Sequence, residues 1–252
     1  MTASIYRPLA FGVTRVQLRD GVPGVHYLQA EQALQDYPQR MSERLQHWAQ
    51  NAPDRTFMAR REKLAGGSRG DWIHVSYAQV WERARNIAQG LINRGLSAQR
   101  PVVILSENDL EHATLAMGCM LAGVPFVPTS PPYSLVSQDF EKLRHVLNTV
   151  LPGLVFAADS ARYGRAILAA VDAGIEVVLT TGTIEGRATT SFADLMATPA
   201  TPEVDAAMAA STAEVAGVAT RSANEVVARP SIAPVVNTTS MSAPTVAWIA
   251  FA

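Results

Sequence analysis

The sequence is poor in cysteine and in lysine. Cys119 is the single cysteine, so the chain cannot form an internal disulfide, which suits a reducing compartment. The residues around it, 117–121, are apolar, and we expect a buried small side chain rather than a reactive thiol. Only two of the 21 basic residues are lysine, Lys63 and Lys142, and no lysine follows Lys142.

Long apolar runs are absent as well. No stretch approaches the ~18 consecutive apolar residues of a membrane-spanning helix. Residues 1–18 carry Arg7 and Arg15 and have no continuous apolar core of the signal-peptide kind. We therefore expect a cytoplasmic protein without a membrane span.

Charge of one sign does not dominate either. The formal net charge is −1 and the basic residues form no run, so nothing predicts a nucleic acid as partner. Hydrophobic residues make up 48% of the chain and charged residues 17%, which is enough apolar material for a sizeable core.

Several motifs of nucleotide and hydrolase chemistry are missing. The sequence contains no Gly-x-x-x-x-Gly-Lys-Ser/Thr loop, no Gly-x-Gly-x-x-Gly turn and no Gly-x-Ser-x-Gly elbow. Thr180–Thr183 has the composition of a phosphate loop but no nearby lysine, so we interpret it as a surface turn. No histidine has metal-ligand spacing to another ligand, and we predict no metal site. The histidines are His26, His47, His74, His112 and His145.

What the sequence does contain is a regular alternation of short apolar runs and amphipathic stretches. Continuously apolar strands are typical of a sheet covered on both faces, and their alternation with helices predicts an α/β fold with a parallel sheet flanked by helices. The predicted strands are residues 101–105, 124–128, 154–157 and 175–179, and the predicted helices start near residues 110, 137 and 161. A helix over 41–49 and a hairpin of strands 56–61 and 72–75 precede them.

Helix starts are marked by capping patterns. Ser76 and Gln79 form a capping box, and Gly95 suits the position after the end of that helix. Asn108 and Glu111 resemble a second box, and we expect Ser137 to cap a third helix. The acidic residues Glu107, Asp109 and Glu111, together with His112, crowd one helix start, and helix-dipole stabilisation explains them better than catalysis does.

The pattern divides the chain into three parts. Residues 1–40 form an amino-terminal arm with a turn at Asp20-Gly21, residues 41–205 form the α/β subdomain, and residues 206–252 are unassigned. The last part is dominated by Ala, Val, Thr, Ser and Pro, and we expect it to be poorly structured beyond a weak helix. Our hypothesis for it is a shifted reading frame or a disrupted gene end.

Ligands of open α/β sheets tend to bind beyond the carboxyl ends of the strands. Here those positions are Ser106–Asn108, Thr129-Ser130 and Asp159-Ser160. Loop polarity alone accounts for such residues, so they mark a place to look, and no catalytic or cofactor-binding residue is assigned.

Several blocks resemble the AMP-forming acyl-CoA synthetase (adenylate-forming) superfamily over roughly residues 7–206. They include residues 43–55, residues 101–112 and Leu121–Pro128, which is similar to the second core motif of the superfamily. The narrower block Ser134–Phe140 resembles the feruloyl-CoA synthetase-like branch.

The resemblance implies an enzyme that joins a carboxylic acid to AMP with ATP and Mg²⁺ and then passes the acyl group to coenzyme A. It also implies a phosphate loop with a lysine shortly after residue 206, which this sequence lacks. We therefore expect an amino-terminal fragment of such a ligase, inactive alone, because adenylation needs positive charge on the phosphates. The alternatives are a non-catalytic α/β interaction module, a subunit completed by another chain, or an unrelated doubly wound domain.

Overall fold

The computed structural model describes residues 15–33, 36–38 and 40–211, in two compact units, Met1–Pro38 and Gln39–Ala252. In the first unit, β1 (Val16–Asp20) and β2 (His26–Ala30) pair as an antiparallel hairpin, which confirms the turn predicted at Asp20-Gly21. Within the described ranges, no helix combines the length and the apolar character needed to cross a membrane.

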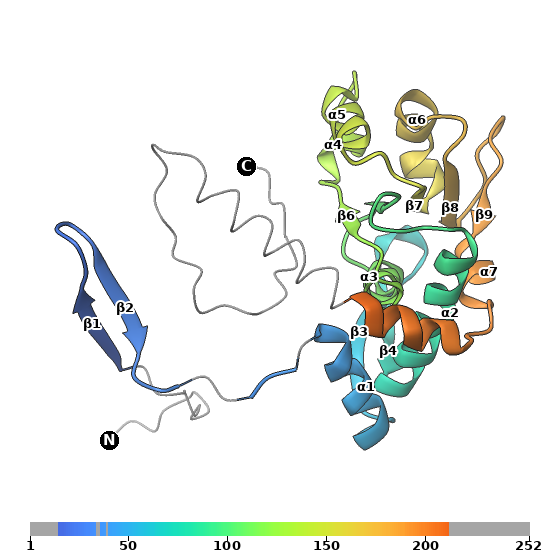
Figure 1. The fold of residues 1–252 in the computed structure, drawn as a ribbon. Helices are drawn as coiled ribbons and strands as arrows, with labels where there is room; N and C mark the ends of the chain where they lie inside the picture. The colour runs from blue at the N-terminus through green and yellow to red at the C-terminus, as the bar shows by residue number, and fades with distance from the viewer. Residues whose placement is uncertain (1–14, 34–35, 39, 212–252) are drawn as a thin grey trace, which may run out of the picture. The chain divides into compact units, whose positions relative to one another are not determined.

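The second unit is built on a five-stranded sheet in the order β6-β5-β7-β8-β9, and every neighbouring pair is parallel (Figure 1). This confirms the predicted parallel sheet. The strands are β5 (Val102–Leu105), β6 (Phe126–Pro128), β7 (Leu154–Asp159), β8 (Glu176–Thr181) and β9 (Thr190–Ser191). β6 pairs with one edge of β5, and β7, which follows β6 in the chain, pairs with the other edge.

Helices cover both faces of this sheet, as the continuously apolar strands predict. Val103 and Leu105 of β5 pack with α5 and α6, whereas Val102 and Ile104 pack with α2, α3 and α7 (Figure 1). The helices are α1 (Met41–Asn51), α2 (Tyr77–Asn93), α3 (Leu110–Ala122), α4 (Pro132–Leu135), α5 (Glu141–Val150), α6 (Ser160–Ala170) and α7 (Phe192–Met196).

A third apolar cluster joins the antiparallel pair β3 (Thr56–Lys63) and β4 (Arg69–Ser76) to α1, α2 and α3. The capping box at Ser76 is present, with the Ser76 hydroxyl accepting from the Gln79 amide and the Gln79 side chain accepting from the Ser76 amide. The helix that begins there is the longest in the described residues and contacts both the sheet and the third cluster.

A further helix at residues 202–211 crosses the boundary predicted between 205 and 206. Val204 and Met208 are buried in the third cluster, so this helix packs as part of the domain. The start of the segment expected to be poorly structured is therefore ordered, because its apolar side chains find a place against α2 and β4. The remaining tail, residues 212–252, lies outside the described residues.

A buried side chain, Gln89, and a partly buried one, Arg85, show how this last helix is held. Gln89, 3% exposed, donates from Nε2 to Asn93 and to Glu203, and its Oε1 accepts from the amide and the hydroxyl of Thr201. Arg85 forms a bidentate ion pair with Asp205. These contacts join α2 to a segment more than 110 residues later in the chain.

Two predicted helix caps are wrong in detail. The cap of α3 is Asp109, whose carboxylate accepts from the Leu110 amide, and not Asn108. The cap position of α5 is Phe140, in a left-handed conformation, and not Ser137. The Ser137 hydroxyl instead accepts from the Phe140 amide, and so it holds the turn that precedes the helix.

Candidate functional site

The strand order places a topological switch point between β5 and β7. From β5 the chain runs outward to β6 in one direction and to β7 and β8 in the other, so the loops after β5 and β7 leave the sheet toward opposite faces. In open α/β sheets the crevice at such a point is the usual ligand position. The predicted positions Ser106–Asn108 and Asp159-Ser160 border this point.

The loop after β5 is tied to both neighbouring helices. Ser106, 4% exposed, lies with its hydroxyl 2.8 Å from Nδ1 of His112 on α3. Burial lowers the pKa of His112, against the opposing effects of the Glu107 backbone and the Asp109 charge. Glu107 accepts from Arg162 of α6 at 2.6 Å. The two helices that flank the switch point are thereby linked to one loop.

Hydroxyl groups at the carboxyl edge are buried without a regular hydrogen bond to any described residue. They belong to Thr129 after β6, Tyr163 on α6 and Thr180 in β8. The pKa of Tyr163 is raised, chiefly by burial. Thr129 follows β6 and Thr180 lies near the end of β8, and β5 and β7 separate these two strands, so the two hydroxyls do not converge on one point. The edge therefore presents no assembled catalytic set.

Within the acidic cluster at the start of α3, Asp109 has the predicted capping role. Asp109 caps the helix, and Arg60 of β3 donates to Asp109 at 2.5 Å and to Glu111 at 3.0 Å. Burial lowers the pKa of Arg60, but the hydrogen bond and charge of Asp109 and the charge of Glu111 outweigh it and leave the pKa raised. Sequence analysis missed Arg60, because it is about fifty residues distant from its partners and carries no local signal.

The other predicted features are placed as follows. Thr180 and Thr181 are the last residues of β8, so the surface turn predicted over Thr180–Thr183 is wrong for its first two residues. Thr181 donates to the Ala158 carbonyl, and Gly182 follows in a left-handed conformation pressed against Ser160. Cys119 is fully buried, which confirms the predicted burial of this side chain, and burial raises the pKa of its thiol. Among the described residues, no group of three or more His, Cys, Asp or Glu side chains is placed to hold a metal ion.

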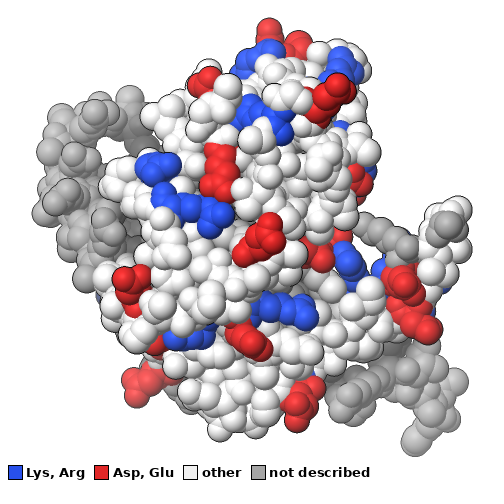
Figure 2. Space-filling model, turned by 90° about the vertical axis from the view of Figure 1, so that its right-hand side faces the viewer, with Lys and Arg blue, Asp and Glu red and all other residues white. Residues whose placement is uncertain are grey.

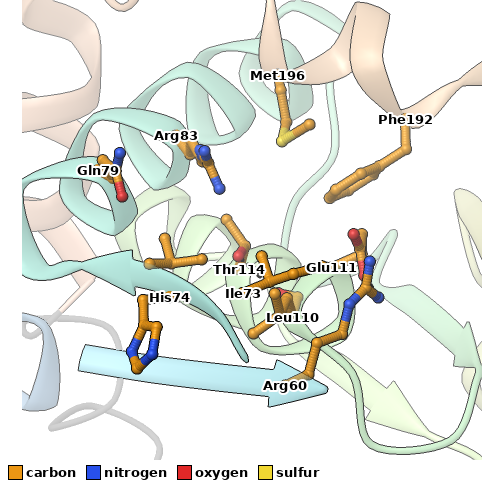
Figure 3. A pocket seen from close by; sticks show the side chains of 11 residues that line it. Arg60, Ile73, His74, Gln79, Arg83, Leu110, Glu111, Thr114, Phe192 and Met196 are labelled. Atoms are coloured by element: carbon orange, nitrogen blue, oxygen red, sulfur yellow. Dashed lines mark hydrogen bonds and ion pairs between the residues drawn. The ribbon is translucent and has the colours of Figure 1, made fainter. Parts of the chain in front are cut away.

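A hollow of about 170 Å³ opens between β3, β4, α2, α3 and α7. Its lining is Arg60, Ile73, His74, Val75, Gln79, Arg83, Leu110, Glu111, Thr114, Phe192 and Met196. Figure 3 shows Arg83, Phe192 and Met196 pointing into it, with Arg60 turned toward Glu111 at the opposite rim. Sites for drug-sized ligands and cofactors are usually about 300–1,000 Å³, so this hollow is too small for a nucleotide.

Charges on the rest of the surface are mixed. On the face drawn in Figure 2, acidic and basic side chains alternate and neither forms a continuous field. Several of the arginines are engaged with carboxylates, including Arg85, Arg94 and Arg162. The face drawn in Figure 2 thus shows no strongly charged region.

Comparison with known proteins gives the family. A model of the family described as AMP-binding enzyme matches residues 45–230. A stretch of 67 residues is 39% identical to fatty acyl-CoA synthetase A of Dictyostelium discoideum and covers 27% of this chain and 10% of that protein. Since the family match continues to residue 230, the predicted loss of family character at about residue 206 is wrong.

Solved structures share the fold at low identity. The coronafacic acid ligase of Pectobacterium brasiliense matches with a TM-score of 0.50 and 13% identity, over 64% of this chain and 30% of that chain. The A-PCP didomain of carboxylic acid reductase from Segniliparus rugosus, in complex with AMP, matches with a TM-score of 0.50 and 15% identity, over 66% and 28%. The chain thus spans less than a third of each of these three proteins. On the family match it belongs to the AMP-binding enzymes of the adenylate-forming superfamily.

Proposed function

We propose that this chain supplies the amino-terminal α/β part of an AMP-forming carboxylate–CoA ligase of the feruloyl-CoA synthetase-like branch. The observation that carries the proposal is the family match over residues 45–230, on a chain that folds as a parallel, helix-covered sheet. The similarity to a fatty acyl-CoA synthetase supports acyl transfer to coenzyme A. The block Ser134–Phe140, which forms the end of α4 and the turn into α5, supports the feruloyl-type branch.

In the proposed reaction, the carboxylate of an aromatic or fatty acid attacks the α-phosphate of ATP and expels pyrophosphate. The thiol of coenzyme A then attacks the acyl carbon of the acyl adenylate and releases AMP. The first step builds negative charge on a pentavalent phosphorus, which must be stabilised by cations and aligned donors. ATP, Mg²⁺ and coenzyme A are accordingly the cofactors and partners of the proposal.

The chain supplies few groups for that stabilisation. Lys142 lies on the exposed face of α5, 5.5 Å from the centre of the Tyr133 ring, and no lysine follows it. Arg162, which borders the switch point, is engaged by Glu107. We therefore propose that the 252-residue chain does not form acyl adenylates by itself. The step requires a phosphate loop and later ligase segments, whether on this polypeptide or on a complementary fragment.

A pyrophosphate-release assay tests this. The purified chain is incubated with ATP, Mg²⁺, coenzyme A and either ferulate or a long-chain fatty acid, and we expect no turnover above the blank. Addition of a fragment that carries the phosphate loop and the carboxyl-terminal domain of a feruloyl-CoA ligase should restore acid-dependent AMP formation. CoA-dependent AMP formation by the chain alone would show that the proposal of inactivity is wrong.

The proposal includes a cytoplasmic location, since a single buried cysteine is compatible with a reducing compartment. Cell fractionation with an antibody against the chain measures this directly. Recovery in the membrane or secreted fraction would contradict it.

A further inference from the structure

Two buried hydroxyl groups without a hydrogen bond lie on the same side of the parallel sheet. Tyr163 is fully buried and Thr129 is 6% exposed, and neither hydroxyl has a hydrogen bond to any described residue. Tyr163 belongs to the apolar cluster that α5 and α6 form over β5. Val127 of β6 packs against the same cluster, and Thr129 follows two residues later, so both side chains leave the backbone on the same side.

The end of β5 brings these two hydroxyls close to the same loop. The Thr129 amide donates to the Ile104 carbonyl at 3.0 Å, which continues the pairing of β6 with β5 and sets Thr129 beside Leu105. Burial raises the pKa of Tyr163 and the Glu107 backbone opposes this, so the phenol oxygen lies near the backbone that follows Leu105. α4, which starts three residues after Thr129, packs against α6, which carries Tyr163.

A buried hydroxyl without a partner opposes folding. It has given up its hydrogen bonds to solvent and receives none in return. Neither Tyr163 nor Thr129 can turn its oxygen toward the solvent, since both side chains are buried. An internal water molecule resolves such a conflict, because it can both donate and accept and needs only about two to four polar partners.

We propose that one buried water molecule bridges the hydroxyls of Tyr163 and Thr129 beside the loop after β5. A hydroxyl has one proton to donate and two lone pairs to accept with, so Tyr163 Oη can donate to the water oxygen while the water donates to Thr129 Oγ1. The bridge ties β6 and α6 to the end of β5, at the switch point of the sheet. It involves neither ATP nor coenzyme A and goes beyond the proposed ligase function.

Melting temperatures of the full 252-residue chain test the proposal. Tyr163→Phe and Thr129→Val each remove a hydroxyl and keep the shape of the side chain. With the bridging water, each change removes a hydrogen bond and should lower the melting temperature by about 2–4 °C. Without the water, each change removes a desolvated group that has no partner and should raise the melting temperature. The sign of the shift therefore distinguishes the two cases.

The double variant of Tyr163→Phe and Thr129→Val tests whether the two hydroxyls share one water. A shared water loses its role with the first change, so the double variant should melt close to the less stable single variant. Thr180→Val is the matched control, because the Thr180 hydroxyl is also buried without a partner. Val178, two residues earlier on β8, faces the opposite cluster, so the effect of Thr180→Val should add to that of Tyr163→Phe.

A high-resolution crystal structure of the chain gives a direct second measurement. It should show one ordered water within hydrogen-bond distance of both Tyr163 Oη and Thr129 Oγ1. The proposal is overturned if either single change raises the melting temperature or leaves it unchanged, if the two single shifts add fully in the double variant, or if the crystal structure shows no water between the two oxygens. The circular dichroism spectrum of each variant establishes that it is folded before melting temperatures are compared.

Discussion

Replacement of Gln89 by leucine should detach the helix at residues 202–211 from α2. The Gln89 amide uses both of its donors and both acceptor positions, and two of its four partners are groups of Thr201. Leucine has a volume similar to that of glutamine, so the substitution leaves little empty space. The loss in free energy of unfolding therefore comes mainly from the lost hydrogen bonds. The two neutral bonds to Thr201, at about 1 kcal/mol each, and part of the charged bond to Glu203 hold the later segment and give about 2–3 kcal/mol. The third neutral bond, to Asn93, lies within α2 and does not hold that segment.

The free energy of unfolding is measured by urea denaturation, with the far-ultraviolet circular dichroism as signal. At about 2–4 °C of melting temperature per kcal/mol for a chain of this size, the same change should lower the melting temperature by about 4–12 °C. Gln50→Leu on the exposed face of α1 is the control and should change the stability by less than about 0.5 kcal/mol.

Hydrogen exchange gives the local test of the same contact. In Gln89→Leu, amides of residues 202–211 should lose protection before those of the central strand β5, because the helix opens while the sheet stays closed. Equal stability of Gln89→Leu and Gln50→Leu, with unchanged exchange at 202–211, would refute the argument. The later helix would then be held by Val204 and Met208 and by the Arg85–Asp205 pair, without a contribution from Gln89.

Gly118→Ala should destabilise the domain by about 1–3 kcal/mol in a denaturant titration, because the added Cβ overlaps Ile87 where α3 crosses α2. Gly174→Ala is the control and should be neutral, because its added Cβ has no atom within 4 Å. The hydrogen bond from Arg85 lowers the pKa of Asp205 below its unfolded value, so the pair stabilises the fold above the unfolded pKa. This stability is lost as the pH falls through the folded pKa. Thermal melting between neutral and acidic pH should therefore show a smaller acid-induced loss for Asp205→Asn than for the wild type, and identical slopes would contradict the assignment.

Local signals in the sequence were sufficient for much of the fold. The capping box at Ser76 and the stop at Gly95 depend on residues a few positions apart, and both are present. The apolar runs predicted the central strands, because a strand covered on both faces must be apolar throughout. The order of the strands is not a local property, and it followed only from the structure.

The sequence did not predict features that depend on contacts between residues far apart in the chain. Phe140 adopts a left-handed conformation because its ring is buried and Ser137 holds its amide, which no capping rule for aromatic residues predicts. The sequence predicted only a weak helix after residue 205, because the composition there is poor in large apolar residues. The order of the helix at 202–211 comes from α2 through Gln89 and Arg85, both more than 110 residues earlier.

At the candidate site, the sequence predicted which loops follow the strands, but not which side chains from other elements contact those loops. The pairing of Glu107 with Arg162 joins the loop after β5 to a helix 55 residues later in the chain. Arg83 falls on a helix surface like any solvated arginine, and only the packing of α7 beside it creates the hollow. Both features arise from tertiary packing, so no spacing rule could have indicated them.

The placement of β5 at the switch point also has a consequence for synthesis on the ribosome. β5 is the first strand of the parallel sheet to be made, yet its partner β7 begins about 50 residues later. At a synthesis rate of about 5–20 residues per second, one edge of a fully apolar strand waits about 3–10 s for its neighbour. During that interval the nascent chain exposes an unpaired edge, so chaperone occupancy should peak between the emergence of β5 and that of β7.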